Sequence, residues 1–254
     1  MKRTIITTLS LLCIATLNSI AQDSNNNKDK SIGNKPTSYI SINIGSAIPL
    51  SDYGNSNQPM YSETQAGYAK KGVGVSIDFA MPINHSQIGI AANVAHYNNK
   101  FNNDAYGADL TLNSTAQSTY YSVGAGDYSI NTLMAGIYLT YPIKKFSVDL
   151  KILAGYSFCT LPDFSVNSYV INNINTLGNA QTPRVHASAF AYGGNITARY
   201  NIYKHICVLG QVNICGMLPT FPANEHISGG FYYQTSWKEQ ITILGFSGGI
   251  GYQL

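Results

Sequence analysis

The sequence predicts an all-β fold, an eight-stranded antiparallel transmembrane β-barrel with short periplasmic turns and long extracellular loops. Eight segments alternate apolar and polar residues, as strands with one apolar face do. Short turns join these segments at one end and long Asn-, Ser- and Gly-rich loops join them at the other, an asymmetry typical of small membrane barrels. Charged residues make up only 11% of the chain, against about a quarter in soluble domains, and it contains 19 Tyr and 23 Gly.

Composition and charge exclude several kinds of fold and partner. Hydrophobic residues form 44% of the chain, an ordinary fraction, so they are dispersed in alternation rather than gathered into spanning helices. The formal net charge is +3. Without the leader residues Lys2 and Arg3, the 15 basic residues become 13, against 12 acidic ones. The remaining net charge of +1 gives no reason to expect a nucleic acid as a partner.

Residues 1–21 have the pattern of a signal peptide. A basic start is followed by an apolar run over residues 5–20 and by a small-x-small site that ends at Ala21. We expect cleavage after Ala21. The alternative, a membrane anchor helix, is disfavoured because the run is short and diluted by Thr and Ser.

Two segments follow the leader. Residues 22–37 are polar and free of aromatic side chains, which favours a disordered periplasmic lead-in. Residues 38–254 carry the alternating pattern and form the predicted barrel domain.

The first four strands are expected at about residues 39–48, 68–81, 87–98 and 128–141. In the first, Ile40 and Ile42 lie on one face and Ser41 and Asn43 on the other. The second and third follow the same rule and meet at a turn that begins at Pro82. The fourth has the least regular alternation, although every second residue from 133 to 141 is apolar.

The last four strands are expected at about residues 146–158, 188–202, 206–217 and 240–254. The fifth strand is the clearest, since Val148, Leu150 and Ile152 alternate with Asp149 and Lys151. The long loops, which we expect outside the cell, fall at about residues 49–67, 99–127, 159–187 and 218–239.

Alternation alone does not decide whether the apolar faces point inward or outward. A soluble lipocalin-like calyx or sandwich would bury them, whereas a membrane barrel would turn them toward lipid. Small and charged groups share the polar face, the chain ends on an apolar residue, and aromatic residues at the ends of the apolar faces suggest two girdles, which together favour the membrane barrel. The expected girdle residues are Tyr39, Phe79, Tyr141, Phe146, Tyr200 and Tyr252 on the turn side and Tyr68, Tyr156, Phe158 and Phe190 on the loop side.

The stretch 240–254 is expected to close the barrel by pairing with the first strand. It resembles the closing strand of bacterial outer-membrane barrels, whose C-terminal residues are read by the barrel-assembly machinery. The usual final residue there is Phe, where this chain has Leu254. The face expected to carry this assembly signal comprises Phe246, Ile250, Tyr252 and Leu254. We expect Tyr252 to contact lipid at the periplasmic interface and Gln253 to face the lumen.

The leader, the lead-in, the eight alternating strands and the end Tyr252-Gln253-Leu254 together resemble the OmpA-like or PorT-like outer-membrane β-barrel families of Bacteroidetes. The resemblance covers residues 38–254 and rests on pattern more than on identical residues. It implies a location in the bacterial outer membrane, with outer-membrane lipid as a partner, and says little about molecular activity. We expect a monomer.

Four charged residues on the polar face form the candidate functional cluster: Asp78, Asp149, Lys151 and Arg199. Each lies three to six residues from a short turn, so they are expected at similar depth in the lumen. The interior of an eight-stranded barrel is just wide enough to be filled by side chains, so charges there must be paired. We expect Arg199 to pair with Asp149, with Lys151 and Asp78 completing a network that plugs the barrel. The alternative is a narrow channel for ions or solutes.

Signals for catalysis are sparse. His186 and Ser188 match part of the lipid A deacylase pattern, which makes a lipid A-modifying hydrolase at the outer rim the second alternative. Their face also carries Phe190 and Tyr192, and no acid follows at the spacing that would orient a base. We therefore expect a structural or surface-interaction role without enzymatic activity.

Metal and cofactor sites are not expected. The five His are scattered along the chain, and no helix follows the Gly-rich stretch 248–251 to receive a phosphate. The loops remain as a functional surface, because residues 98–103 and 231–237 mix aromatic and hydrogen-bonding groups. An extracellular ligand could bind there, with generic solvated loops as the alternative.

Overall fold

A computed structural model describes residues 36–56, 66–84, 86–112, 119–170, 173–222, 226–228, 231–233 and 236–254. The predicted signal peptide, most of the predicted lead-in, and the ends of some long loops fall outside the described residues. All of the described helices and strands belong to the compact unit Lys35–Leu254. Among the described residues, no helix is long and apolar enough to cross a membrane.

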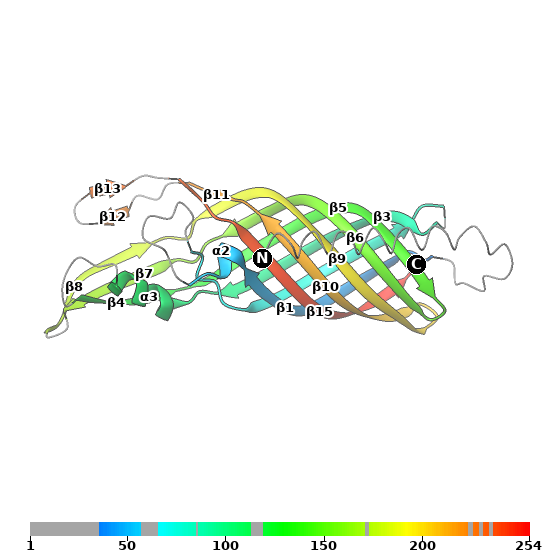
Figure 1. The fold of residues 1–254 in the computed structure, drawn as a ribbon, viewed down its shortest axis with the longest axis horizontal. Helices are drawn as coiled ribbons and strands as arrows, with labels where there is room; N and C mark the ends of the chain where they lie inside the picture. The colour runs from blue at the N-terminus through cyan, green and yellow to red at the C-terminus, as the bar shows by residue number, and fades with distance from the viewer. Residues whose placement is uncertain are drawn as a thin grey trace, which may run out of the picture. The chain divides into compact units, whose positions relative to one another are not determined.

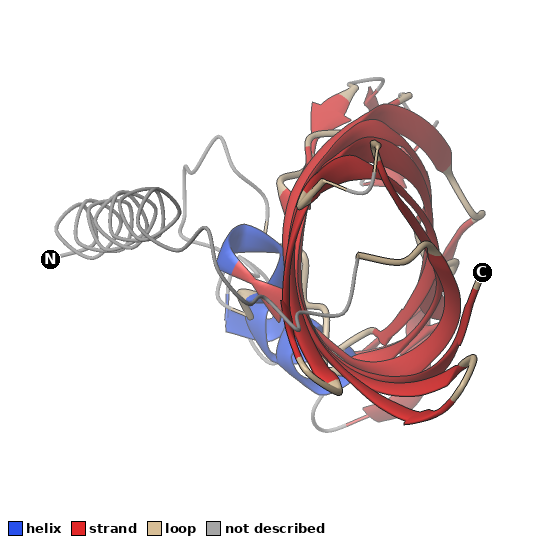
Figure 2. Cartoon of the chain, turned by 90° about the vertical axis from the view of Figure 1, so that its right-hand side faces the viewer, coloured by secondary structure: helices blue, strands red, loops and turns tan. Residues whose placement is uncertain are grey.

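Within the described part of this unit, eight strands form a closed antiparallel barrel (Figures 1 and 2). They are β1 (Tyr39–Leu50), β2 (Gly72–Pro82), β3 (Ile88–Lys100), β5 (Asp127–Ile143), β6 (Phe146–Thr160), β9 (His186–Tyr203), β10 (Ile206–Met217) and β15 (Ile241–Gln253). Barrel strands that follow one another along the chain pair with each other, and β15 pairs with β1 to close the ring. The predicted fold class is confirmed. The largest difference in boundary is at β2, which begins at Gly72 because Tyr68 takes a left-handed backbone with φ of 51°.

The barrel turns its apolar face outward. Ile42 and Ile250 are 64% and 66% exposed, whereas Asn43, the residue that follows Ile42 on β1, is only 1% exposed. The same rule holds on the other barrel strands, whose outward positions carry large aliphatic or aromatic side chains. A ring of exposed apolar residues around a barrel without edges suits lipid, which supplies no hydrogen bonds to backbone groups. The soluble calyx, which would bury these residues, is therefore excluded.

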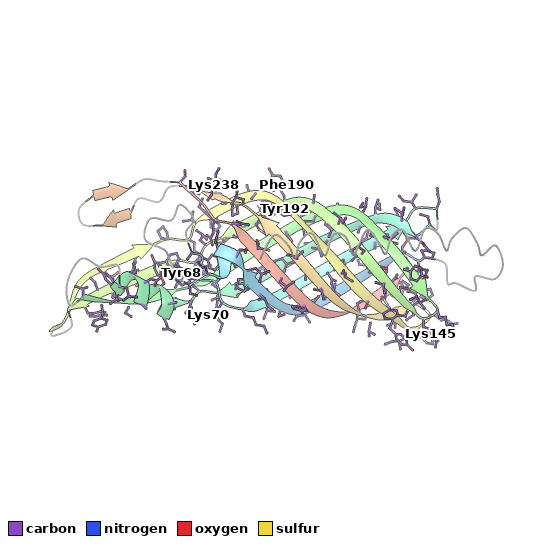
Figure 3. The ribbon with its side chains drawn as sticks, viewed as in Figure 1. Tyr68, Lys70, Lys145, Phe190, Tyr192 and Lys238 are labelled. Atoms are coloured by element: carbon purple, nitrogen blue, oxygen red, sulfur yellow. The ribbon has the colours of Figure 1, made fainter. Side chains whose placement is uncertain are left out.

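Most of the expected girdle residues lie on the outer surface, but two do not. The exposed members are Tyr141, Phe146, Tyr156, Phe158, Phe190, Tyr200 and Tyr252, which Tyr192 joins beside Phe190 (Figure 3). Phe79 has the outward parity of Ile77 on β2 and is half-buried. Tyr39 and Tyr68 are 0% and 2% exposed, so their assignment to the girdles was wrong. Tyr39 has the inward parity of Ser41 and Asn43, and Tyr68 precedes β2 and packs against Phe101.

The long extracellular loops contain more regular structure than the sequence predicted. α3 (Asn103–Leu112), β4 (Thr119–Ala125), β7 (Phe164–Val170) and β8 (Asn173–Thr182) build a helix and a three-stranded sheet, in the order β4-β7-β8, from two of these loops (Figure 1). The shorter elements are α2 (Ser51–Gly54), β11 (Thr220–Phe221) paired with β14 (Trp237–Lys238), and β12 (His226–Ser228) paired with β13 (Phe231–Tyr233). These strands were missed because they lie within stretches whose overall content of Asn, Ser and Gly is typical of loops.

Candidate functional site

The periplasmic part of the lumen holds a charged layer. β2 contributes Asp78, β6 contributes Asp149 and Lys151, and β9 contributes Arg199. All four are at most 2% exposed. Asp149 and Lys151 are two residues apart and so share the inward face of β6, and β6 pairs directly with β9. The structure thus brings together the four residues of the predicted cluster.

Two ion pairs organise this layer. Lys151 Nζ lies 3.0 Å from Asp78 Oδ1, and Arg199 Nη2 lies 3.5 Å from Asp149 Oδ1. Because β5 and β3 separate β6 from β2 in the ring, the Lys151–Asp78 pair crosses the lumen. Asn43 Nδ2 also donates to Asp78 Oδ2 at 2.8 Å. Asn43 on β1 packs closely against Gly249 on β15. A Cβ at position 249 would collide with Asn43 Oδ1.

Tyr39 is a member of the charged layer that sequence reasoning placed elsewhere. Its ring centroid lies 4.2 Å from Arg199 Cζ and 5.3 Å from Lys151 Nζ. Both distances allow cation–π attraction, which strengthens when the cation is removed from water. Tyr39 shares its parity in β1 with Ser41 and Asn43, and this pattern in the sequence would have predicted its inward position.

The two ion pairs differ in how many of their polar atoms have a hydrogen-bond partner. Among the described residues, Arg199 Nε, Arg199 Nη1 and Asp149 Oδ2 have no hydrogen-bond partner. Buried charged atoms without partners are costly, so these atoms mark the place where water would be most favourable in the layer.

The middle of the lumen is narrow. A cavity of about 20 Å³ lies there, with Asn93, Asn195, Gln211 and Asn213 among its polar lining and Met134 among its apolar lining. This is the space of one or two water molecules. A dissolved solute therefore meets a filled interior between the two ends of the barrel.

An aromatic cap covers the extracellular end of the lumen. Its rings are Tyr53, Tyr68, Phe101, Tyr106, Tyr128 and Phe164. Tyr53 meets Tyr128 edge-on with centroids 5.1 Å apart, and Phe101 meets Phe164 in the same way at 4.9 Å. These residues come from α2, α3, β5, β7 and connecting segments, so no single periodic pattern in the sequence groups them.

Glu239 is buried beneath this cap. The residue is 5% exposed, and no Lys, Arg or His in the described part of the chain forms an ion pair with it. Tyr128 Oη lies 3.5 Å from Glu239 Oε1 and also donates to the Gly67 carbonyl. Burial raises the pKa of Glu239 to about 7, because the charged form loses its hydration without gaining a cation. Glu239 lies in an irregular segment between β14 and β15, so no periodic pattern in the sequence marked it as buried.

The candidate rim residues lie on the outside of the barrel. His186 and Ser188 are exposed on β9, on the face that also carries Phe190 and Tyr192. His186 Nδ1 lies 2.9 Å from Thr160 Oγ1. Among the described residues, no group of His, Cys, Asp and Glu is arranged to hold a metal ion.

The residues expected to form the assembly signal share the outer face of β15 or follow it. Phe246, Ile250, Tyr252 and Leu254 are between 48% and 66% exposed, and Gln253 is buried on the lumen side. β15 is hydrogen-bonded to β1 on one side and to β10 on the other. This strand therefore presents a continuous apolar surface next to the point where the barrel closes.

The closed, edge-free ring and its outward apolar belt decide the architecture. The chain is a transmembrane β-barrel. No protein-family model matches the sequence, and no curated protein matches it.

Solved structures of membrane barrels resemble this one in fold. Neisserial surface protein A (NspA) is 11% identical with a TM-score of 0.44, over 85% of this chain and 97% of that one. A major outer membrane protein from Thermus thermophilus is 12% identical with a TM-score of 0.45, over 86% and 100%. Outer membrane protein AlkL is 11% identical with a TM-score of 0.43, over 90% and 95%.

Proposed function

We propose that this barrel is a non-enzymatic structural or surface-interaction protein of the outer membrane rather than a channel. The observation that carries the proposal is a lumen obstructed at three levels. The charged layer fills its periplasmic part, the middle leaves about 20 Å³, and the aromatic cap lies over its extracellular end. A static path for ions would have to cross all three levels.

Its partners follow from its surfaces. Outer-membrane lipid covers the apolar belt, and the barrel-assembly machinery recognises Phe246, Ile250, Tyr252 and Leu254 on the closing strand, whose exposure supports this assignment. The chain acts as a monomer and belongs with the OmpA-like or PorT-like barrels, a proposal that rests on the alternating sequence pattern and its C-terminal end.

A conductance measurement tests the obstructed lumen. The full-length chain, purified from outer membranes and inserted into a planar bilayer, should give no single-channel steps under conditions in which an open porin does. Reproducible steps of uniform size would overturn the structural role and favour the narrow channel.

The narrow channel is the second candidate because of one observation. Arg199 Nε, Arg199 Nη1 and Asp149 Oδ2 have no hydrogen-bond partner among the described residues, so water could enter the charged layer there. If conduction occurs, replacing Arg199 by Met should change its ion selectivity, since the substitution removes a cation from the charged layer that the path must cross. Selectivity that does not respond to this substitution would place the current outside the lumen.

A further inference from the structure

α3 lies along the free edge of β4 in the sheet formed by β4, β7 and β8. The backbone N–H of Tyr121, which points out of that edge, donates to Thr111 Oγ1 at 3.2 Å, and Gly107 of α3 lies near the Tyr121 carbonyl and the Val123 side chain. Tyr121 and Val123 share the half-buried face of β4. Along β4, Tyr120 and Ser122 alternate with these residues and are exposed. We call this second face the outer sheet face.

The outer sheet face carries uncharged side chains in cross-strand rows. The rows are Tyr120–Tyr169, Ser122–Asn167–Asn179 and Gly124–Ser165–Gln181. The rings of Tyr120 and Tyr169 stack with centroids 5.0 Å apart and an interplanar angle of 17°, and Tyr120 remains 41% exposed. Flat aromatic surface therefore adjoins two rows of hydroxyl and amide groups.

A hollow of about 770 Å³ lies at the end of this face nearest the barrel. Its lining includes Gly124, Gly126, Asp163, Phe164, Ser165 and Gln181. Two glycines keep it open. A Cβ at Gly126 would lie 2.5 Å from Asp163 Oδ1, and a Cβ at Gly124 would meet no atom within 4 Å, so the floor of the hollow is free.

The charge in the hollow is balanced within the protein. Asp163 Oδ1 lies 3.1 Å from Arg184 Nε in an ion pair, and both side chains are more than half exposed. The paired guanidinium holds the pKa of Asp163 below its ordinary value, so the carboxylate stays ionised beside its cation. The hollow thus offers an incoming ligand no unpaired charge, and it has the hydrogen-bonding capacity of Ser165, Gln181 and the outer oxygen of Asp163.

We propose that the hollow and the adjoining rows bind an uncharged oligosaccharide from outside the cell. Ser, Asn and Gln each donate and accept hydrogen bonds, as the neighbouring hydroxyls of a sugar require. The ring of Tyr120 offers an apolar face for the C–H side of a sugar ring. The volume of the hollow falls in the range of small-ligand pockets, about 300–1,000 Å³.

Other occupants fit this surface less well. An anionic polymer needs unpaired cations, and Arg184, the cation at the hollow, is already paired with Asp163. Lipid needs an apolar surface such as the barrel belt, which the outer sheet face lacks. The assignment rests on the surface-interaction role proposed above and specifies the partner of that role.

The test uses the full-length chain in detergent and measures binding to immobilised dextran, laminarin and mannan, with dextran sulfate as the anionic counterpart. At least one neutral polysaccharide should bind, and dextran sulfate should not bind more tightly than dextran. Tyr120→Ala should weaken binding about tenfold through lost stacking. Gly124→Leu should weaken it to a similar degree, because its side chain fills the hollow without a backbone clash.

Matched controls separate the site from general damage. Gly210→Leu places the same side chain at another glycine whose Cβ would meet nothing within 4 Å, and Tyr203→Ala removes an exposed tyrosine at a periplasmic turn. Both should bind like the unaltered chain. Binding by no neutral polysaccharide, tighter binding of dextran sulfate, or equal binding by all four variants would overturn the proposal. If the chain binds a neutral polysaccharide and also gives single-channel steps, only the proposal of an obstructed lumen is refuted.

Discussion

The two ends of the lumen bury carboxylates in different surroundings. At the periplasmic end, Asp78 and Asp149 each face a cation across a short distance, and Tyr39 lies against both cations. At the extracellular end, Glu239 lies beneath aromatic rings with Tyr128 as its hydrogen-bonding neighbour. One end is closed by paired charges, and the other is closed by packing over an acid that burial tends to keep protonated. The comparison predicts that the two ends respond differently to mutation and to pH.

The largest effect is expected from separating the cross-lumen ion pair. Lys151→Met leaves Asp78 buried with Asn43 and Ser76 but without its cation, which should lower the free energy of unfolding by about 3–5 kcal/mol. Denaturant unfolding in lipid vesicles measures the change.

The double variant is the control for this prediction. Lys151→Met with Asp78→Leu removes both charges and should recover most of the lost stability, because no uncompensated charge remains. If Lys151→Met alone is as stable as the unaltered protein, the charged layer is hydrated. The contrast between the two ends of the lumen is then removed.

The next effect concerns the pH dependence of the cap. The pKa of Glu239 is about 7 in the folded chain and 4.5 in its ordinary state. Between these values the folded state holds a proton that the open state releases, so the stability of the closed cap should fall as pH rises from about 4.5 to about 7. The loss is at most about 3 kcal/mol and is constant above that range.

Hydrogen exchange around Glu239 measures this opening. The groups that face it are Tyr53 of α2, Gly67, Tyr128 of β5 and Cys159 of β6. Glu239→Gln keeps the shape and removes the titration, so exchange should become independent of pH over this window after correction for its intrinsic rate. Persistence of the same pH dependence in Glu239→Gln would assign it to another group.

A smaller effect is expected from Tyr39. Tyr39→Leu removes the ring beside Arg199 and Lys151 and should cost about 1–2 kcal/mol of stability. Tyr39→Phe keeps the ring and serves as the control, with a loss below that of Tyr39→Leu in the same denaturant measurement. Equal losses would mean that the hydroxyl, rather than the ring face, accounts for the role of Tyr39.

The contrast between the ends also explains what the sequence could predict. Strand alternation orients every second side chain, so Asp78, Asp149, Lys151 and Arg199 could be placed in one layer before the structure was known. Pairing partners across the lumen depend on strand order and register, so that same alternation could not link Lys151 to Asp78.

The extracellular end lacked such a guide. Glu239 and Tyr53 come from a loop and a short helix, and their contacts with Tyr128 of β5 depend on how separate loops fold over the barrel. The sheet rows at Ser122 and Asn167 were missed for a related reason, since their strands are seven residues long and lie within stretches rich in Asn, Ser and Gly.

The smallest effect is expected at the outer rim. If the extracellular end is only a closure, Ser188→Ala should leave the acylation of lipid A unchanged in cells that depend on this chain, as measured by mass spectrometry of extracted lipid A. Ser188 is exposed beside Phe190 and Tyr192 on the outer face, and the neighbouring His186 contacts Thr160 rather than a carboxylate. His186→Ala is the companion variant and should also leave the acylation of lipid A unchanged. A changed acyl pattern in both variants would make the rim a hydrolase site, and the extracellular end would then differ from the periplasmic end in chemistry as well as in packing.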